Sequence, residues 1–542
     1  MSSIQNGNAQ HRLNPFELLE ISCLIQSYLQ GDIRAVLSCC LVSKSFNRGF
    51  QPLLWESLSI TPCKKNQLPR IPSVDVLEAK KDLVKSIKFD LRYNPEDTFA
   101  TKILPKIETT TFPHLKRLHF SLLNWTQDLI DTSAATIYNH QRTLEELELR
   151  GLDCAEEPVR LWRKIFGLEQ LRKLGLRSVN FIGLEQNSLF WRILTSPSLR
   201  EVCLNDVCLI DSSAEAMEFE QEEQQQHQGL RHLTVINMRC GHIEYRQFLR
   251  TLVRFTNLTL LVSHMISGLS IYEVYPLLRS LDKCFDTANP GPYWKHLTTF
   301  SYLDCVFMDD EQSGSFLGSL NPGLKNLSLE KSSFGDISLQ TLMQHHSKTL
   351  TRLNLISPSY PTGRMVRVLL GNCENLESLC GLELPISDLT RCDDLQHGRG
   401  CLGRCHLWVC TNLQEWGVDI DNNVDDCPSS LELVAFERLS TLSRLKAIIL
   451  KPYSSKHKKQ IRFQLGCGLE QLELRRGSLE ELQFDQRWIS REDWKWIIGT
   501  FKQLNKVTAC QDWPRTARRL EFLRNLSLQN RRIDFNLVRV GC

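Results

Sequence analysis

Apolar residues recur in a spaced triplet along most of the chain. The first, fourth and sixth residues of each triplet are apolar and separated by mostly polar residues, as in Leu144, Leu147 and Leu149. Residues two apart on a strand point to the same side of a sheet, so the fourth and sixth side chains should be buried together. The pattern therefore predicts one short strand per copy. Copies begin at residues 115, 144, 171, 199, 230, 297, 324, 350, 376, 413, 442 and 469.

The spacing of the copies predicts the architecture. In the series that begins at residue 115, successive copies start 29, 27, 28 and 31 residues after the previous one. In the series that begins at residue 297, the steps are 27, 26 and 26 residues. This period is typical of leucine-rich repeats, whose return segments are often helical. One repeat cannot bury its apolar face alone, so repeats must stack. The expected fold class is α/β, with an irregular leucine-rich-repeat solenoid (a horseshoe) over residues 83–542. A solenoid of helix pairs is the alternative, but the two-residue step favours strands.

The repeats depart from the usual pattern at the ninth position, where Asn or Cys is expected. Cys305 fits, but Leu152, Val179, Val207 and Met238 do not. Wider gaps between copies also predict degenerate repeats or inserted loops. We expect such loops near residues 210–229, 388–409 and 451–460.

The first 60 residues follow a helical pattern instead. Leu18, Ile21, Ile25, Tyr28 and Leu29 recur at spacings of three and four, which places them on one helical face. Gly31 should end this helix and Asp32 should cap the next, and Ser43 can cap a third. The later stripes contain Val36, Cys39, Cys40 and Val42, then Phe46, Phe50, Leu53 and Leu54. Three helices in about 45 residues bury little core, so they must dock on the following domain or offer an apolar face to a partner.

This block resembles an F-box. The resemblance is carried by Glu20-Ile21, Ile25, Tyr28-Leu29, Val42-Ser43-Lys44, Phe46 and Leu54-Trp55. Leu18 stands where the family has Pro, and the stretch from Leu29 to Val42 is about two residues longer than the usual pattern. Ordinary helices that cap the solenoid are the alternative.

The resemblance implies an N-terminal three-helix F-box that docks to the Skp adaptor of a Skp–cullin–F-box ubiquitin ligase. The implied adaptor-binding residues are Leu18, Glu20, Ile21, Ile25, Tyr28, Leu29, Val36, Val42, Phe46, Leu54 and Trp55. Together with the repeats, the chain resembles the divergent F-box/leucine-rich-repeat proteins of fungi, which implies a substrate receptor. The domains are then a disordered N-terminus (1–12), an F-box-like domain (13–60), a linker (61–82) and the solenoid.

The third, fifth and seventh residues of each triplet should point to the concave face, opposite the buried leucines. Such a curved array is a common protein-binding surface. Lys and Arg total 65 against 62 Asp and Glu, a net charge of +3, which favours a target protein over nucleic acid. The substrate-binding candidates are Arg117, His119, Glu146, Glu148, Arg150, Lys173, Arg177, Glu201, Asn205, Arg352, Asn354, Glu415, Asp419, Glu473 and Arg475.

The cysteine content and the N-terminal sequence indicate the cellular compartment of the protein. The 20 cysteines follow a polar N-terminus without an apolar signal segment, which favours reduced thiols in the cytoplasm or nucleus. The longest apolar stretch, around 258–271, is too short and too polar to cross a bilayer, so we expect no membrane partner.

Motifs for catalysis or metal binding are weak. Cys401, Cys405, His406 and Cys410 could supply zinc ligands, but they lack the paired spacing of strong zinc motifs. The acidic run from Asp419 to Asn423 lacks the Gly and Glu that an EF-hand loop requires. No nucleophile elbow, Walker loop or His-Glu-x-x-His helix occurs. We therefore expect no enzyme activity, cofactor or metal. The alternatives to a ligase subunit are a leucine-rich scaffold without a ligase role and, less favoured, a metal-binding enzyme.

Overall fold

The computed structural model describes only part of the 542-residue chain. The described residues are 24–25, 28–29, 32–60, 73–90, 107–122, 125–152, 158–210, 229–240, 247–248, 251–252, 255–264, 294–303, 309–320, 322–330, 333–356, 363–385, 408–421, 429–450, 464–475, 477–485, 489–511 and 533–539. The chain divides into two compact units. Unit 1 is Met1–Glu223 with Met238–Gly241, and unit 2 is Gln224–Asn237 with His242–Cys542.

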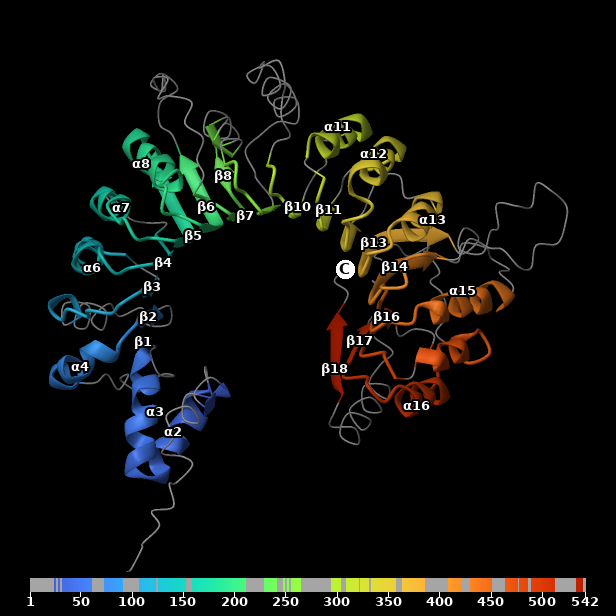
Figure 1. Cartoon of the computed structure of the whole chain (residues 1–542), viewed down its shortest axis with the longest axis horizontal. Coiled ribbons are helices and arrows are strands. Elements are labelled where there is room, and N and C mark those ends of the chain that lie inside the picture. Colours follow the sequence, from blue (N-terminus) through green and yellow to red (C-terminus); the bar gives the residue numbers. More distant parts are fainter. Residues whose placement is uncertain are drawn as a thin grey trace, which may run out of the picture. The chain divides into compact units, whose positions relative to one another are not determined.

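The described part of unit 1 contains a helical pair followed by a parallel sheet with helices on one side (Figure 1). Each strand pairs in parallel with the next, and β6 pairs with β8. Its helices are α2 (Ile33–Val42), α3 (Lys44–Glu56), α4 (Val74–Lys80), η2 (Lys81–Leu83), α6 (Gln127–Asn139), α7 (Val159–Phe166) and α8 (Leu184–Leu194). Its strands are β1 (Ser57–Ile60), β2 (Ser86–Asp90), β3 (Arg117–Ser121), β4 (Glu146–Arg150), β5 (Lys173–Ile182), β6 (Glu201–Ile210) and β8 (Arg239–Cys240).

Unit 2 repeats the same plan. Strand β7 pairs with β9, and each later strand pairs in parallel with its successor. Its strands are β7 (His232–Ile236), β9 (Leu260–His264), β10 (Thr299–Leu303), β11 (Asn326–Glu330), β12 (Arg352–Ile356), β13 (Ser378–Pro385), β14 (Glu415–Asp421), β15 (Ala447–Ile449), β16 (Glu481–Asp485), β17 (Lys506–Gln511) and β18 (Asp534–Arg539). Its helices are α11 (Asp310–Ser319), α12 (Asp336–His346), α13 (Gly363–Asn372), α15 (Ser429–Thr441), η4 (Leu469–Arg475) and α16 (Arg491–Thr500).

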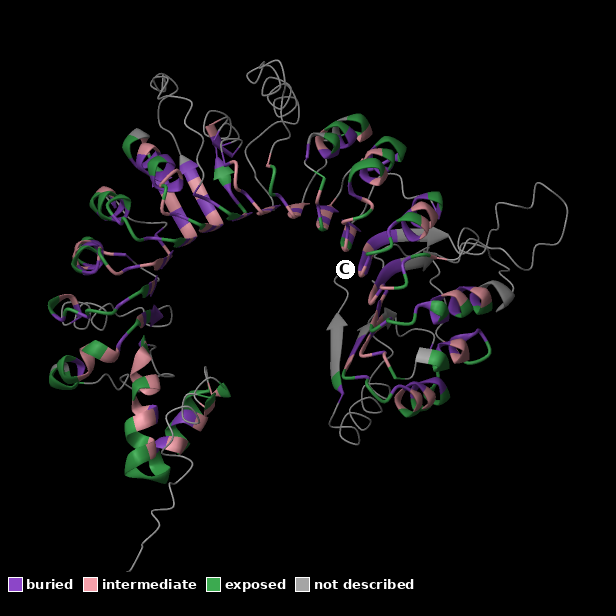
Figure 2. Cartoon of the chain, in the orientation of Figure 1, coloured by how far each residue is buried: buried purple, intermediate pink, exposed green. Residues whose placement is uncertain are grey.

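The register explains how the triplets form a core. Leu147 lies directly between Leu118 and Leu174 in the ladder, and all three are buried. The same alignment joins Leu327 to Leu353 in unit 2. Buried residues line the boundary between strands and helices within each unit, and exposed residues cover the outer helix surfaces (Figure 2). The predicted α/β class and the stacked, solenoid-like repeats are therefore confirmed.

The turn after each strand explains the unusual ninth position. The eighth residue has a positive φ in four consecutive repeats of the clear N-terminal series: Gly151 (86°), Ser178 (50°), Asp206 (56°) and Asn237 (52°). The ninth residues that follow are all buried: Leu152, Val179, Val207 and Met238. The left-handed turn directs the ninth side chain into the core, where an apolar residue replaces the hydrogen-bonding Asn or Cys. Cys305 lies outside the described residues.

Two predicted triplets were wrong. Strand β15 follows Leu445, whose amide donates to the carbonyl of Leu442 (3.2 Å) in a tight turn. Leu442 is therefore a buried turn residue and not the first residue of a triplet. The triplet beginning at Leu469 forms the 3-10 helix η4 instead of a strand, and β16 follows Leu479.

The domain boundary also differs from the prediction. Strand β1 lies inside the predicted helical domain yet pairs with β2, so the sheet begins at Ser57 and not at residue 83. The second half of the predicted linker forms α4 and η2. The predicted insertions fall almost entirely outside the described residues. Among the helices that the structure describes, none is both long and apolar enough to cross a membrane.

Candidate functional site

Side-chain caps define the helical pair formed by α2 and α3 of unit 1. Asp32 Oδ1 accepts the Ala35 amide at 3.0 Å, which begins α2. Ser43 Oγ accepts the Phe46 amide at 3.1 Å, which begins α3. These bonds satisfy amides that the first turn of a helix leaves unpaired. The predicted capping roles of Asp32 and Ser43 are confirmed, and a single residue separates the two helices.

The pair encloses a small apolar core. Val36 and Cys40 of α2 and Phe50 of α3 are buried together, and Phe46 stacks on Phe50 with ring centroids 5.4 Å apart. Ile25, Leu29, Cys39, Leu53 and Leu54 pack partly buried against this core. A core of this size stabilises the pair only weakly.

A second face of α2, beside the one that packs into this core, is apolar and exposed. Ile33, Leu37 and Leu41 follow one another at a spacing of four, which aligns them along one helix face. We call these three residues the α2 row. Leu41 has a relative exposure of 80%, and Tyr28 and Val42 are also exposed. An exposed group of large apolar side chains is typical of an interaction site.

The predicted adaptor-binding residues divide between core and surface. Leu18, Glu20 and Ile21 lie outside the described residues. Val36 is buried, so it supports the helical pair from within and does not itself form surface. Of the predicted residues that the structure describes, Tyr28 and Val42 are exposed, while Ile25, Leu29, Phe46, Leu54 and Trp55 are partly buried. The prediction missed Ile33, Leu37 and Leu41, although their spacing in the sequence marks a second apolar face of α2.

Polar contacts join the helical pair to the first repeat. Lys80 Nζ donates to Gln51 Oε1 at 3.3 Å, and the Lys85 amide donates to the Glu56 carbonyl at 2.9 Å. Lys85 Nζ also lies 3.5 Å from a Glu56 carboxylate oxygen. Strand β1 continues directly from α3, so the pair is attached to the sheet of unit 1 by its backbone as well.

The residues at the third, fifth and seventh positions of each triplet form the second candidate site, which we call the polar sheet face. In unit 1 its centre is Glu148 on β4. His119 Nδ1 lies 2.8 Å from Glu148 Oε2, and Arg177 Nε lies 2.8 Å from Glu148 Oε1. The bond from His119 and the charges of His119, Arg177 and Lys88 lower the pKa of Glu148, against the opposing effect of burial. Gly175 on β5 is the register partner of Glu148. Because glycine has no side chain, the Glu148 side chain can lie over it.

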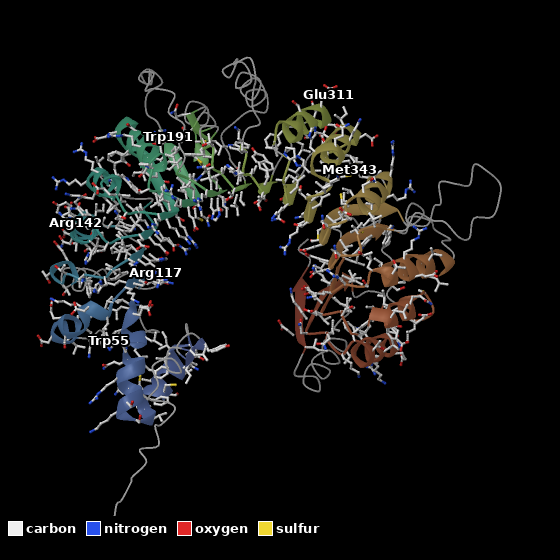
Figure 3. The ribbon with its side chains drawn as sticks, viewed as in Figure 1. Trp55, Arg117, Arg142, Trp191, Glu311 and Met343 are labelled. Carbon is white, nitrogen blue, oxygen red and sulfur yellow. The ribbon has the colours of Figure 1, made fainter. Side chains whose placement is uncertain are left out.

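Other predicted residues of unit 1 also lie on this face. Lys173 Nζ and Glu201 Oε2 are 3.3 Å apart. Arg117, Glu146, Arg150 and Asn205 occupy the expected strand positions and are half-buried or exposed. Figure 3 shows the Arg117 side chain on the side lined by the strands, whereas Trp191 belongs to α8 on the helix side. The structure thus brings together the charged residues that the triplet pattern grouped.

The polar sheet face of unit 2 has a different chemistry. Asn326 Nδ2 donates to Thr299 Oγ1 at 2.9 Å, and Asn354 Nδ2 donates to Ser328 Oγ at 3.2 Å. Glu415 Oε2 accepts from Ser378 Oγ at 2.8 Å. Uncharged amide and hydroxyl groups therefore dominate strands β10 to β13.

The remaining predicted residues of unit 2 have mixed outcomes. Arg352 is exposed on β12 as expected. Asp419 lies in β14, with its side chain outside the described set. Glu473 and Arg475 belong to the 3-10 helix η4 and not to a strand, so their assignment to the sheet face was wrong. The apolar residues from Leu469 onward have the spacing of a repeat triplet, but they form a 3-10 helix instead of a strand.

The described residues do not form a metal site. No group of three or more His, Cys, Asp or Glu side chains in this part of the chain is arranged to hold a metal ion. Cys410 is fully buried, and burial raises the pKa of its thiol to about 12. The thiolate is the form that binds metals, so metal binding at Cys410 would require the loss of this proton. Cys401, Cys405 and His406 lie outside the described residues.

Comparisons with known proteins do not assign a family. No family model matches the chain. No curated protein matches it either. A solved structure described as the crystal structure of the Rad7 and Elc1 complex in yeast is 14% identical over 81% of this chain and 91% of that chain, with a TM-score of 0.40. A likeness of this size carries no functional assignment, so function has to be inferred from the residues of this chain.

Proposed function

We propose that this protein is the substrate receptor of a Skp–cullin–F-box ubiquitin ligase. The helical pair binds the Skp-type adaptor and, through it, a cullin ligase core. The polar sheet face binds a target protein. The chain itself is not an enzyme in this proposal, because ubiquitin transfer takes place on partner subunits in the cytoplasm or nucleus.

The α2 row is the observation that carries the proposal. Ile33, Leu37 and Leu41 are exposed on a helical pair that keeps only a small core for itself. Burying one such leucine against a partner contributes about 1.5–3 kcal/mol. The F-box-like residues supply the chemical identity of that partner, since their resemblance implies a Skp adaptor.

Attachment of this pair to a repeat surface gives the proposed mechanism. Strand β1 follows α3 without a break, so a bound adaptor and a bound target are held by one chain. Tethering raises the effective concentration of the target near the transfer machinery. Selectivity then depends on which protein the polar sheet face holds.

Co-purification with a Skp-type adaptor tests the proposal. Wild-type protein should retain the adaptor, and the double variant Leu37→Asp, Leu41→Asp should lose it, because two charges would be buried in an apolar interface. Exposed positions are preferred to Ile25 and Leu29, which also pack against the core of the pair. The double variant should unfold at the wild-type temperature.

Leu474→Asp is the matched control. Leu474 is 70% exposed, comparable with Leu41, but it lies in η4 of unit 2. This variant should retain the adaptor. If wild type binds no adaptor at micromolar concentration, the ligase role fails and the scaffold alternative takes its place.

A further inference from the structure

Glu415 differs from the other glutamates of its sheet face that have charged partners. Glu148 in unit 1 pairs with Arg177 at 2.8 Å, and Glu481 in unit 2 pairs with Lys506 at 2.6 Å. Glu415 instead accepts from two neutral side chains of β13, Ser378 Oγ at 2.8 Å and Cys380 Sγ at 3.5 Å. Its carboxylate is therefore oriented by its neighbours, and no cation from the described residues neutralises it.

The side chains around Glu415 are small. Its register partners are Ser378 on β13 and Ala447 on β15, and Gly417 follows it on its own strand. A Cβ atom at residue 417 would lie 2.5 Å from Cys380 Sγ, so the packing there requires glycine. Consequently no large side chain of these neighbours covers the carboxylate.

The nearest described basic residue in the same row lies two strands from Glu415 and forms no ion pair with it. Arg352 on β12 is separated from it by Ser378 on β13. Two strand spacings amount to about 10 Å between backbones. Each carboxylate oxygen accepts one bond from β13, and a carboxylate has about four lone-pair sites, which leaves about two for an external donor.

We infer that Glu415 binds a Lys or Arg side chain of an extended peptide segment of the target. The strands before it offer suitable neighbours, because Asn326 Nδ2 and Asn354 Nδ2 each donate one amide hydrogen to a neighbouring hydroxyl and carry a second one that can donate to a peptide carbonyl. Charge complementarity at Glu415 and neutral hydrogen bonding along β11 to β13 favour a basic residue flanked by uncharged residues. This inference rests on the proposed target-binding role of the polar sheet face.

Peptide pools provide the test. Degenerate peptides of uncharged polar residues, with the central position fixed as Lys, Arg, Gln or Glu, are passed over immobilised full-length protein. The Lys and Arg pools should bind wild type about tenfold more tightly than the Gln pool, which corresponds to one charge-assisted bond. Glu415→Gln should remove this preference, and Glu481→Gln should keep it because Glu481 already has a cationic partner.

A second variant guards against a folding defect. Ala447→Lys places a cation beside Glu415 in the register and should also suppress the preference for basic peptides. Equal binding of the Lys, Arg and Gln pools to wild type, or binding of none of them, would overturn the inference. So would an equal loss of preference in Glu415→Gln and Glu481→Gln. Glu415→Gln should bind the adaptor as tightly as wild type does. A failure of the peptide test can therefore be distinguished from a failure of the proposed ligase role.

Discussion

Asp310 joins two neighbouring repeats through one carboxylate. It lies at the start of α11, and its Oδ1 atom accepts the amides of Gly335 (2.7 Å) and Ser338 (3.0 Å) at the start of α12. Its Oδ2 atom accepts the Ile337 amide at 2.9 Å. Burial alone would raise the pKa of Asp310, but the bonds from Ser338, Ile337 and Gly335 outweigh it and lower the pKa. The ionised form therefore stabilises the fold.

Asp310→Ala should destabilise the fold by about 1–2 kcal/mol at pH 7, the usual cost of losing a helix cap. The folded pKa lies below the unfolded pKa of about 3.9, so this stabilisation is present above that pH and is lost as the pH falls further. Urea unfolding at several pH values measures the difference. Glu311→Ala, which removes an exposed carboxylate from the next position (Figure 3), should change stability by less than about 0.5 kcal/mol; an equal effect would contradict the capping role.

His346 is a buried histidine at the end of α12. Its Nε2 atom lies 3.1 Å from the Leu317 carbonyl oxygen, to which it can donate. Burial lowers the pKa of His346, and the bond to Leu317 opposes this only in part. The folded state therefore favours the neutral ring more strongly than the unfolded state does.

The pH dependence of stability tests this property of His346. Its folded pKa is lower than its unfolded pKa of about 6.5, so its contribution to stability is complete above that pH and falls as the solution becomes more acidic. His346→Gln should weaken the loss of stability between pH 7.5 and 5.5, measured by urea unfolding. The exposed neighbour provides the control: if His345→Gln weakens that loss equally, burial is not the cause.

At the scale of elements, the sequence pattern predicted most strands but placed two triplets at the wrong residues. The two-residue step in Leu324, Leu327 and Leu329 identifies β11 because burial alternates along a strand. The triplet predicted at Leu442 was misplaced by three residues. Leu442 occupies a buried turn position just before the true triplet, and that position also accepts leucine. The helix cap by Asp310 could not be predicted, since its partners lie 25 to 28 residues away in the next repeat.

Two leucines that the triplet pattern treats alike should respond differently to one substitution. Leu327 is buried in β11, and Leu474 is exposed in η4. Leu327→Asp should destabilise the protein by at least about 3 kcal/mol, because it leaves an unpaired charge in an apolar core.

Leu474→Asp should change stability by less than about 0.5 kcal/mol. Thermal unfolding of both variants measures the contrast. Unchanged unfolding of Leu327→Asp would mean that the repeat register is wrong.

At the scale of the whole molecule, the two units share one repeat but present different surfaces. The polar sheet face of unit 1 is charged and largely paired, as around Glu148, whereas that of unit 2 is mainly neutral around a carboxylate at Glu415. The sequence predicted that strand positions would carry polar residues. It could not predict which charges pair, because pairing depends on the register between repeats. Likewise, it marked the N-terminal helices as a docking element but did not separate their core from their surface.

The affinity of the full-length protein for a Skp-type adaptor tests the central claim most directly. Isothermal titration should give a dissociation constant of about micromolar or tighter for wild type and for Leu474→Asp. For Leu41→Asp it should be weaker by at least about tenfold, because burial of this one leucine is worth more than 1.4 kcal/mol. Equal affinity of wild type and Leu41→Asp, or no measurable adaptor binding by wild type, would contradict the account.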